Sequence, residues 1–156
     1  TTDFDNLRKR YISFFGEEPA PQGAIESIEA MPKVTLPNDV RQIATFYCGG
    51  ILGGKAHNSL AATGPTANVV DETNRLRFAV DLPERFLVLA EPANSLIVLD
   101  CESHATGAPA VIWCDAHDVG RLDDLQAMSN PPETWPNYST FFSHLLDEEE
   151  DERGET

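Results

Sequence analysis

Positive charge is scarce in this sequence. Only three of its 156 residues are lysine, and lysine and arginine together number 11 against 26 aspartates and glutamates, which gives a formal net charge of −15. Proteins that bind the phosphate backbone of nucleic acids depend on clusters of lysine and arginine. We therefore expect no direct binding of nucleic acid. A basic protein partner fits the charge, although acidity of this kind also serves simply to keep a protein in solution.

Long apolar runs and cysteine pairs are also missing. No stretch approaches the roughly 18–20 apolar residues of a membrane span, and Thr1–Asp5 lacks the basic region and apolar segment of a secretory signal. The three cysteines, Cys48, Cys101 and Cys114, are an odd number and are widely spaced. A disulfide framework needs an even set, so we expect a reducing, cytoplasmic location and no contact with membranes.

Helical periodicity dominates both ends of the chain. Apolar residues recur at steps of three and four, and they predict helices over 4–15, 25–29, 36–50 and from Ser139 to Leu146. In the third of these, Pro37 suits the first helical position, and Gly49–Gly50 suits the end of a helix. The acidic residues from 147 onward have no apolar surface to bury. We expect residues 148–156 to be a disordered tail that follows a single domain at 1–147.

The middle of the chain has the pattern of strands. Residues 53–74 show no sustained period and are expected to be a long loop, whereas 122–128 predict a short helix and 130–137 a rigid connector. Strands with short connections are predicted at 76–82, 85–90, 95–101 and 110–114. Connections this short can join only antiparallel neighbours. The predicted fold class is α+β, with a mostly antiparallel sheet flanked by helices at the N- and C-terminal ends.

A glycine-rich segment comes close to a nucleotide-binding motif. Gly49–Lys55 matches the first seven positions of the phosphate-binding loop G-x-x-x-x-G-K-[ST], but Ala56 stands where the magnesium-binding hydroxyl belongs. Such a loop must also follow a strand and open a helix, and here a predicted helix precedes it. A glycine-rich helix exit is the preferred interpretation, and a nucleotide-binding function remains an alternative.

A second cluster combines a thiol, an imidazole and carboxylates. Cys114, Asp115, His117 and Asp118 lie within five residues and could serve a metal ion or a cysteine nucleophile. A nucleophile needs its histidine placed across a cleft, which adjacency in sequence does not provide, and no further pair completes a zinc set. We interpret Cys114 as the packed end of a strand. No catalytic residue, metal site or cofactor is predicted, although a Cys/His enzyme remains an alternative.

Several short motifs together resemble the SUKH superfamily. They are Ile25-x-x-Ile28-Glu29, Leu36-Pro37-x-Asp39-Val40, Gly49-Gly50, Ile97-x-x-Asp100 and Trp135-x-x-Tyr138-Ser139-x-Phe141-Phe142-x-x-Leu145-Leu146, over roughly residues 24–147. The resemblance implies an α+β domain without enzymatic activity. Many bacterial members of that superfamily are immunity proteins that neutralise a toxin, often a nuclease, and others are regulatory adaptors. The matching residues read as fold-forming, so the resemblance implies no active site.

The acidic residues of the middle segment are the candidate partner-binding site. Residues 79–135 hold ten acids and only two bases, Arg85 and Arg121. Our hypothesis is that this segment faces a basic protein toxin, with acidic pairing that speeds and orients association while apolar anchors supply most of the affinity. The candidate residues are Glu102, Asp115, Asp118, Asp123 and Asp124.

Overall fold

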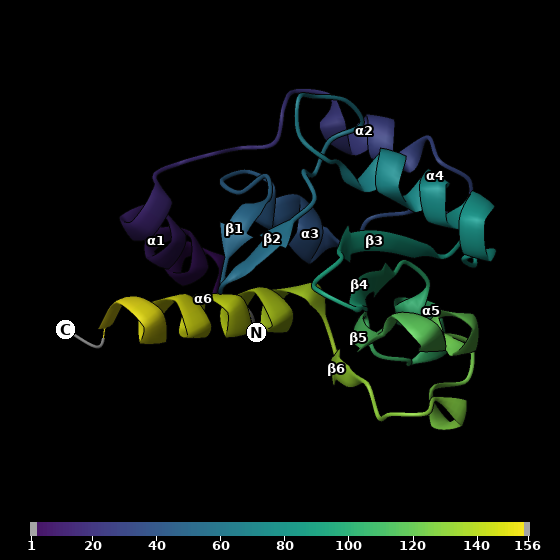
Figure 1. Ribbon diagram of the computed structural model, residues 1–156. Coiled ribbons are helices and arrows are strands. Elements are labelled where there is room, and N and C mark those ends of the chain that lie inside the picture. Colours follow the sequence, from purple (N-terminus) through teal and green to yellow (C-terminus); the bar gives the residue numbers. More distant parts are fainter. Residues whose placement is uncertain (1–2, 155–156) are drawn as a thin grey trace.

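A single antiparallel sheet runs through the molecule, and its strands lie side by side in the order in which they occur in the chain (Figure 1). The structure is a computed structural model that describes residues 3–154. Its strands are β1 (Gly50–Leu52), β2 (Lys55–His57), β3 (Phe86–Ala90), β4 (Ser95–Asp100), β5 (Val111–Asp115) and β6 (Glu133–Trp135). Its helices are α1 (Phe4–Phe15), α2 (Ala24–Glu29), α3 (Asn38–Ile43), α4 (Val69–Val80), α5 (Ser103–Thr106) and α6 (Tyr138–Gly154), with 3-10 helices η1 (Ala116–Arg121) and η2 (Leu125–Ala127). The predicted α+β class is confirmed.

The central strands β3, β4 and β5 are buried on both faces, which explains why their sequences are almost continuously apolar. On one face, residues such as Leu87 and Ile97 belong to a core shared with α1, α2, α3 and α6. On the other face, Val88 and Val98 pack with Leu76 of α4 and with the η1 segment. Helices therefore cover both sides of the sheet.

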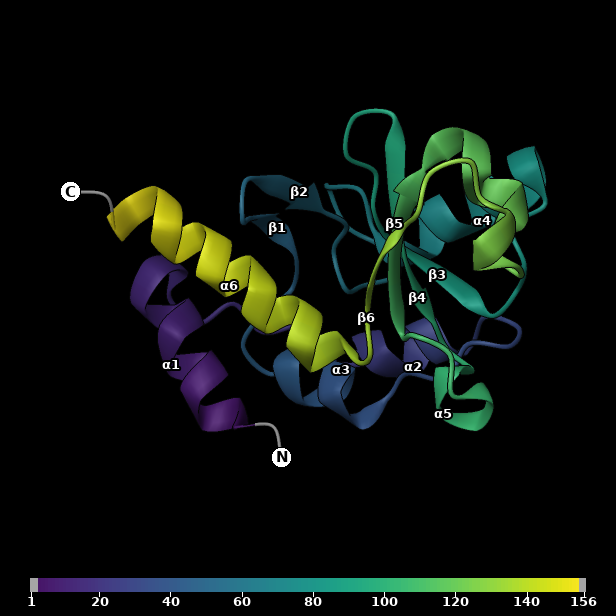
Figure 2. The same cartoon turned by 90° about the horizontal axis from the view of Figure 1, so that it is seen from below.

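The terminal helices lie next to each other, as both views show (Figures 1 and 2). The Tyr11 ring of α1 lies 6.0 Å from that of Phe142 in α6, between centroids, and 5.3 Å from that of Tyr47. At the rim of this aromatic cluster, the Arg10 guanidinium pairs with Asp147 at 2.6 Å and with Glu150 at 2.9 Å. The two ends of the chain are thus held together by an aromatic core with an ionic border.

The strand predicted at 76–82 is wrong, because residues 76–80 belong to α4 and Asp81 ends that helix. Asn68 caps the helix by accepting the Asp71 N–H at 2.8 Å, and the helix ends at Asp81 in the left-handed conformation. The buried positions Val69, Thr73 and Leu76 follow helical spacing, but the polar threonine hides that pattern in the sequence. Phe78 and Val80 look like strand positions, yet both are exposed.

Thr73 is buried because α4 covers an edge of β3 that no strand covers. Strand β2 pairs with β3 only through His57 and Ala90, so the backbone of Val88 has no strand partner on that side. The Thr73 hydroxyl accepts the Val88 N–H at 2.8 Å, and the Asn58 amide donates to the Val88 carbonyl at 3.2 Å. Side chains therefore satisfy the backbone groups that a neighbouring strand would otherwise bind.

The predicted helix over 36–50 is also too long, and the loop at 53–74 is only partly a loop. Helix α3 ends at Ile43, and β1 and β2 follow as a hairpin that turns at Gly53 and Gly54. Gly49 has a φ of +110°, and a Cβ there would lie 2.7 Å from the Asn58 carbonyl oxygen. Gly49 permits this close approach because it has no side chain, and Gly50 begins the hairpin. At the predicted helix end, only the ability of glycine to adopt a positive φ would have mattered.

The predicted disordered tail is helical as far as Gly154. Among these residues, Glu149 is buried and its carboxylate accepts the Gly53 N–H at 3.0 Å. Glu148 pairs with Lys55 at 2.8 Å, and Arg153 lies 4.7 Å from the ring centroid of Phe14. The acidic run was expected to have nothing to bury, but the hairpin and α1 supply partners. Residues 155 and 156 of the predicted tail lie outside the described residues.

Smaller differences lie between β5 and α6. The helix predicted over 122–128 is reduced to the 3-10 helix η2, and η1 precedes it. The connector at 130–137 contributes β6, whose Trp135 pairs with Val111 of β5. No helix between residues 3 and 154 combines the length and apolarity that a bilayer crossing requires.

Candidate functional site

The two bases of the acidic segment are both bound to buried carboxylates. Arg85, which directly precedes β3, places its Nε 3.3 Å from Oδ2 of Asp100 at the end of β4. Arg121, at the end of η1, places a guanidinium nitrogen 2.9 Å from Oδ1 of Asp118. Burial raises the pKa of the Asp100 carboxyl, against a backbone hydrogen bond from Glu102 and the charge of Arg85. Arg121 thus compensates a charge inside the fold, whereas Arg85 is shared between the buried Asp100 and the exposed Asp123, whose Oδ1 lies 2.9 Å from its guanidinium.

Asp118 is a structural residue and does not face a partner. Its side chain is 0% exposed, and its carboxylate accepts the backbone N–H of Ser129 at 3.0 Å and that of Asn130 at 3.4 Å, besides the bond from Arg121. The hydrogen bond from Ser129 lowers the pKa of this carboxyl, with further contributions from Asn130, His117 and Arg121. Asp118 fixes η1 against the segment that leads to β6. Nothing in its sequence context distinguished it from the exposed acids nearby.

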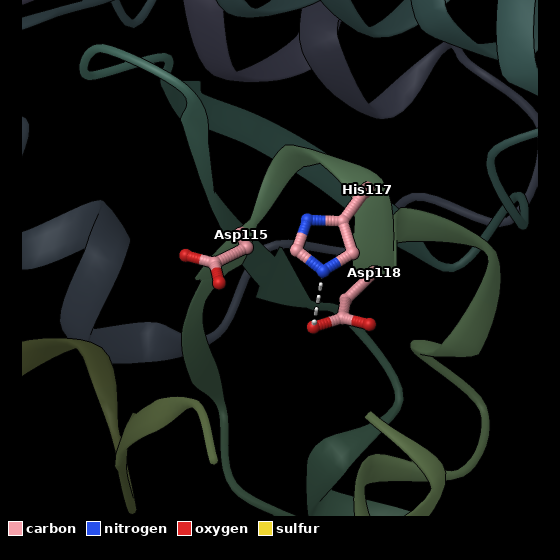
Figure 3. A group of neighbouring side chains, drawn as sticks. All are labelled: Asp115, His117 and Asp118. Carbon is pink, nitrogen blue, oxygen red and sulfur yellow. Dashed lines mark ion pairs between the residues drawn. The ribbon is translucent and has the colours of Figure 1, made fainter. Parts of the chain in front are cut away.

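The carboxylate–imidazole cluster predicted as an alternative site does form. Ligand-capable atoms of Asp115, His117 and Asp118 lie within 4.8 Å of one another, and Figure 3 shows the His117 imidazole facing the Asp118 carboxylate, 3.8 Å away. Asp118, however, is already bound by two backbone N–H groups and an arginine, and the Asp115 carboxylate accepts the Asn130 amide at 2.5 Å. These carboxylates are engaged within the protein, which disfavours a role as cation ligands.

Cys114 precedes this cluster but has the chemistry of a core residue. Its side chain is buried in β5 among the apolar residues of the α4-facing core. Burial raises the pKa of the thiol to about 11, so the thiolate that a nucleophile requires is disfavoured at neutral pH. Its interpretation as the packed end of a strand is confirmed.

The glycine-rich segment Gly49–Lys55 does not have the geometry of a phosphate-binding loop. It leads into and around the β1–β2 hairpin, whereas that loop connects a strand to a helix. The Lys55 ammonium binds the Glu148 carboxylate at 2.8 Å and the Gly53 carbonyl at 3.2 Å, and it lies 4.9 Å from the Trp113 ring centroid. Its charge is directed at α6 and at an aromatic ring.

The five candidate acids do not form one patch. Asp115 pairs with Ser95 at the start of β4, whereas Glu102 follows the other end of that strand. At about 3.4 Å per residue, the two ends of β4 are roughly 17 Å apart. Asp123 lies at the same end of β4 as Glu102, because Arg85 contacts Asp123 at 2.9 Å and also contacts Asp100. Glu102, Asp123 and its exposed neighbour Asp124 therefore lie toward one end of the strands, and Asp115 lies at the other.

Sequence reasoning missed residues that extend the first of these groups. Asp81 and Glu84 lie in the connection from α4 to β3, next to Arg85 and so close to the segment of Asp123. Within residues 3–154, Asp81, Glu84 and Asp124 are exposed and make no ion pair with any base. Phe78, on the last turns of α4, has an exposed fraction of 93%. The acidic α4 surface is defined by Phe78, Asp81, Glu84, Asp123 and Asp124.

Comparison with models of known protein families gives no match, and comparison with curated proteins gives no significant match either.

Proposed function

We propose that this chain is a non-enzymatic binding protein of the SUKH type that neutralises a basic toxin, such as a nuclease, by direct protein–protein contact. The observation that carries the proposal is the ion pairing of the two arginines in residues 79–135. Both are paired with buried carboxylates, and among the exposed acids of the same segment only Asp123 and Glu91 are also bound by an arginine within residues 3–154, so the segment keeps most of its negative charge. A surface of this kind attracts a basic partner and orients it during the encounter.

Several residues behind the family resemblance contribute to packing and backbone geometry, which is the kind of role that the proposal gives them. Trp135 and Phe141 are buried against each other, with ring centroids 4.8 Å apart. Pro37 precedes the first turn of α3, and Gly49 allows the close approach of the Asn58 backbone. These positions shape the domain.

The site of action is proposed to be the cytoplasm. Cys48, Cys101 and Cys114 are all free thiols, and burial raises the pKa of Cys101 to about 12. A reducing compartment suits a chain whose thiols contribute to the core without forming a disulfide.

Co-expression with the toxin encoded beside this chain's gene tests the function, with cell survival as the readout. The charge argument is tested by D124K, which reverses an exposed carboxylate that makes no ion pair within residues 3–154. At low salt we expect an association rate lower by a factor of about three to ten, and at high salt the variants should converge because the attraction is screened. The double variant D123K/D124K should show a larger effect.

The matched control is E26K, which makes the same charge change on the exposed side of α2. It should leave the association rate close to that of the wild type. The charge argument is wrong if D124K and E26K behave alike at every ionic strength. The proposed function itself fails if the wild type neither binds the toxin nor protects the cell.

A further inference from the structure

We propose that Phe78 is the apolar anchor with which the acidic α4 surface binds a basic protein partner. The proposal rests on the proposed function in one respect, namely that the partner is basic. It adds the face that binds and the side chain that supplies affinity, neither of which follows from net charge.

The exposure of Phe78 has no structural explanation in the fold. The other seven phenylalanines of the chain are buried or half-buried, whereas Phe78 is 93% exposed. Exposing a complete aromatic ring forgoes roughly 1.5–3 kcal/mol of burial free energy. Aromatic side chains with this exposure are typical of the anchors that dominate protein–protein interfaces, where they fill a pocket on the partner.

The exposed face of α4 around Phe78 is acidic. Asp71 lies seven residues before the ring, so the two share one face of the helix, and Asp81 caps the end of the helix three residues after the ring. Arg75, on the same face, binds both Glu72 and Glu91 and therefore adds no net positive charge there.

Arg77 is bound in another direction, to the backbone carbonyls of Pro32 at 3.0 Å and Glu84 at 2.7 Å. An apolar ring with carboxylates on either side along the helix matches a partner that has an apolar recess bordered by lysine or arginine. A second copy of this chain does not match, because two chains of net charge −15 repel each other.

Titration with a synthetic amphipathic peptide of lysine and leucine, followed by NMR of the ¹⁵N-labelled protein, tests this face without knowledge of the natural partner. Amide shifts should change over residues 71–84 and at 123–124. F78A should weaken peptide binding about tenfold, as expected on removal of an anchor. I51A is the matched control, because Ile51 is 70% exposed but lies in β1, away from this surface. Its affinity should equal that of the wild type.

The inference is overturned if the shifts map to the carboxylates of α6, or if F78A and I51A bind the peptide equally well. Measuring how well F78A protects cells from the toxin encoded beside this chain's gene separates this inference from the proposed function. Protection by the wild type together with full activity of F78A would refute the anchor and leave the function standing. A peptide footprint on α4 in a protein that gives no protection would refute the function and leave the anchor standing.

Discussion

Replacement of Glu149 by alanine gives a sharp test of whether the acidic end of the chain belongs to the folded domain. The carboxylate accepts the N–H of Gly53 at 3.0 Å and that of Arg153 Nε at 2.5 Å. In E149A, the Gly53 N–H is left buried beneath α6 without an acceptor, which costs about 1–3 kcal/mol. The half-exposed Arg153 is rehydrated, so loss of that pair adds less than about 1 kcal/mol.

We therefore expect E149A to lower the free energy of unfolding by about 2–3 kcal/mol. For a chain of this length, this corresponds to a fall in Tm of about 4–12 °C. Urea and thermal unfolding followed by far-ultraviolet circular dichroism measure both quantities. E149Q keeps an acceptor for the Gly53 N–H and should lose less than E149A.

The control is E152A, which removes an exposed carboxylate from the same helix turn and should change the free energy of unfolding by less than about 0.5 kcal/mol. If E149A proves as stable as E152A, the reasoning is refuted, because α6 would then not be docked on the hairpin. If E149Q loses as much as E149A, the ion pair with Arg153 would outweigh the hydrogen bond to Gly53.

Two further predictions concern His57 and Lys55. Burial lowers the pKa of His57 to about 4, while its ring donates a hydrogen bond to the Leu52 carbonyl. Between pH 6.5 and 4 the unfolded chain binds a proton that the native state does not, so stability should fall by about 3 kcal/mol as the pH is lowered through this window. Urea unfolding at several pH values should show this slope for the wild type and lose it for H57Q. Calorimetric titration with ATP and magnesium should show no saturable binding, because the Lys55 charge is directed at Glu148; binding that disappears in K55A would favour a nucleotide-dependent function.

The sheet was largely predictable because its strands carry their own pattern. Phe86–Ala90 and Leu96–Leu99 are continuously apolar and are joined by an evident turn, which is what strands buried on both faces require. The segment at 76–82 misled because its apolar residues alternate by chance. The helical face instead uses Thr73, whose role at the uncovered edge of β3 depends on where β2 stops pairing. No local pattern reports that tertiary requirement.

The candidate site was predictable in charge but not in position. The sequence shows that residues 79–135 are acidic, yet it cannot show that Asp118 is buried under backbone N–H groups from a segment 11 residues further on. It likewise cannot separate Asp115 from Glu102, because their separation follows from strand register. Phe78 was assigned to a strand face, so its exposure was missed.

The order of the strands has a consequence for how the chain folds. Each strand of the sheet pairs with its neighbour in sequence, so the loops that must close during assembly of β3, β4 and β5 are short and cost little conformational entropy. The docking of α1 on α6 is different, since Arg10 and Glu150 are 140 residues apart. Contacts over such a distance are expensive to form before the intervening chain is compact. We expect the meander to organise first and the two ends of the chain to join last, as the step that completes the domain.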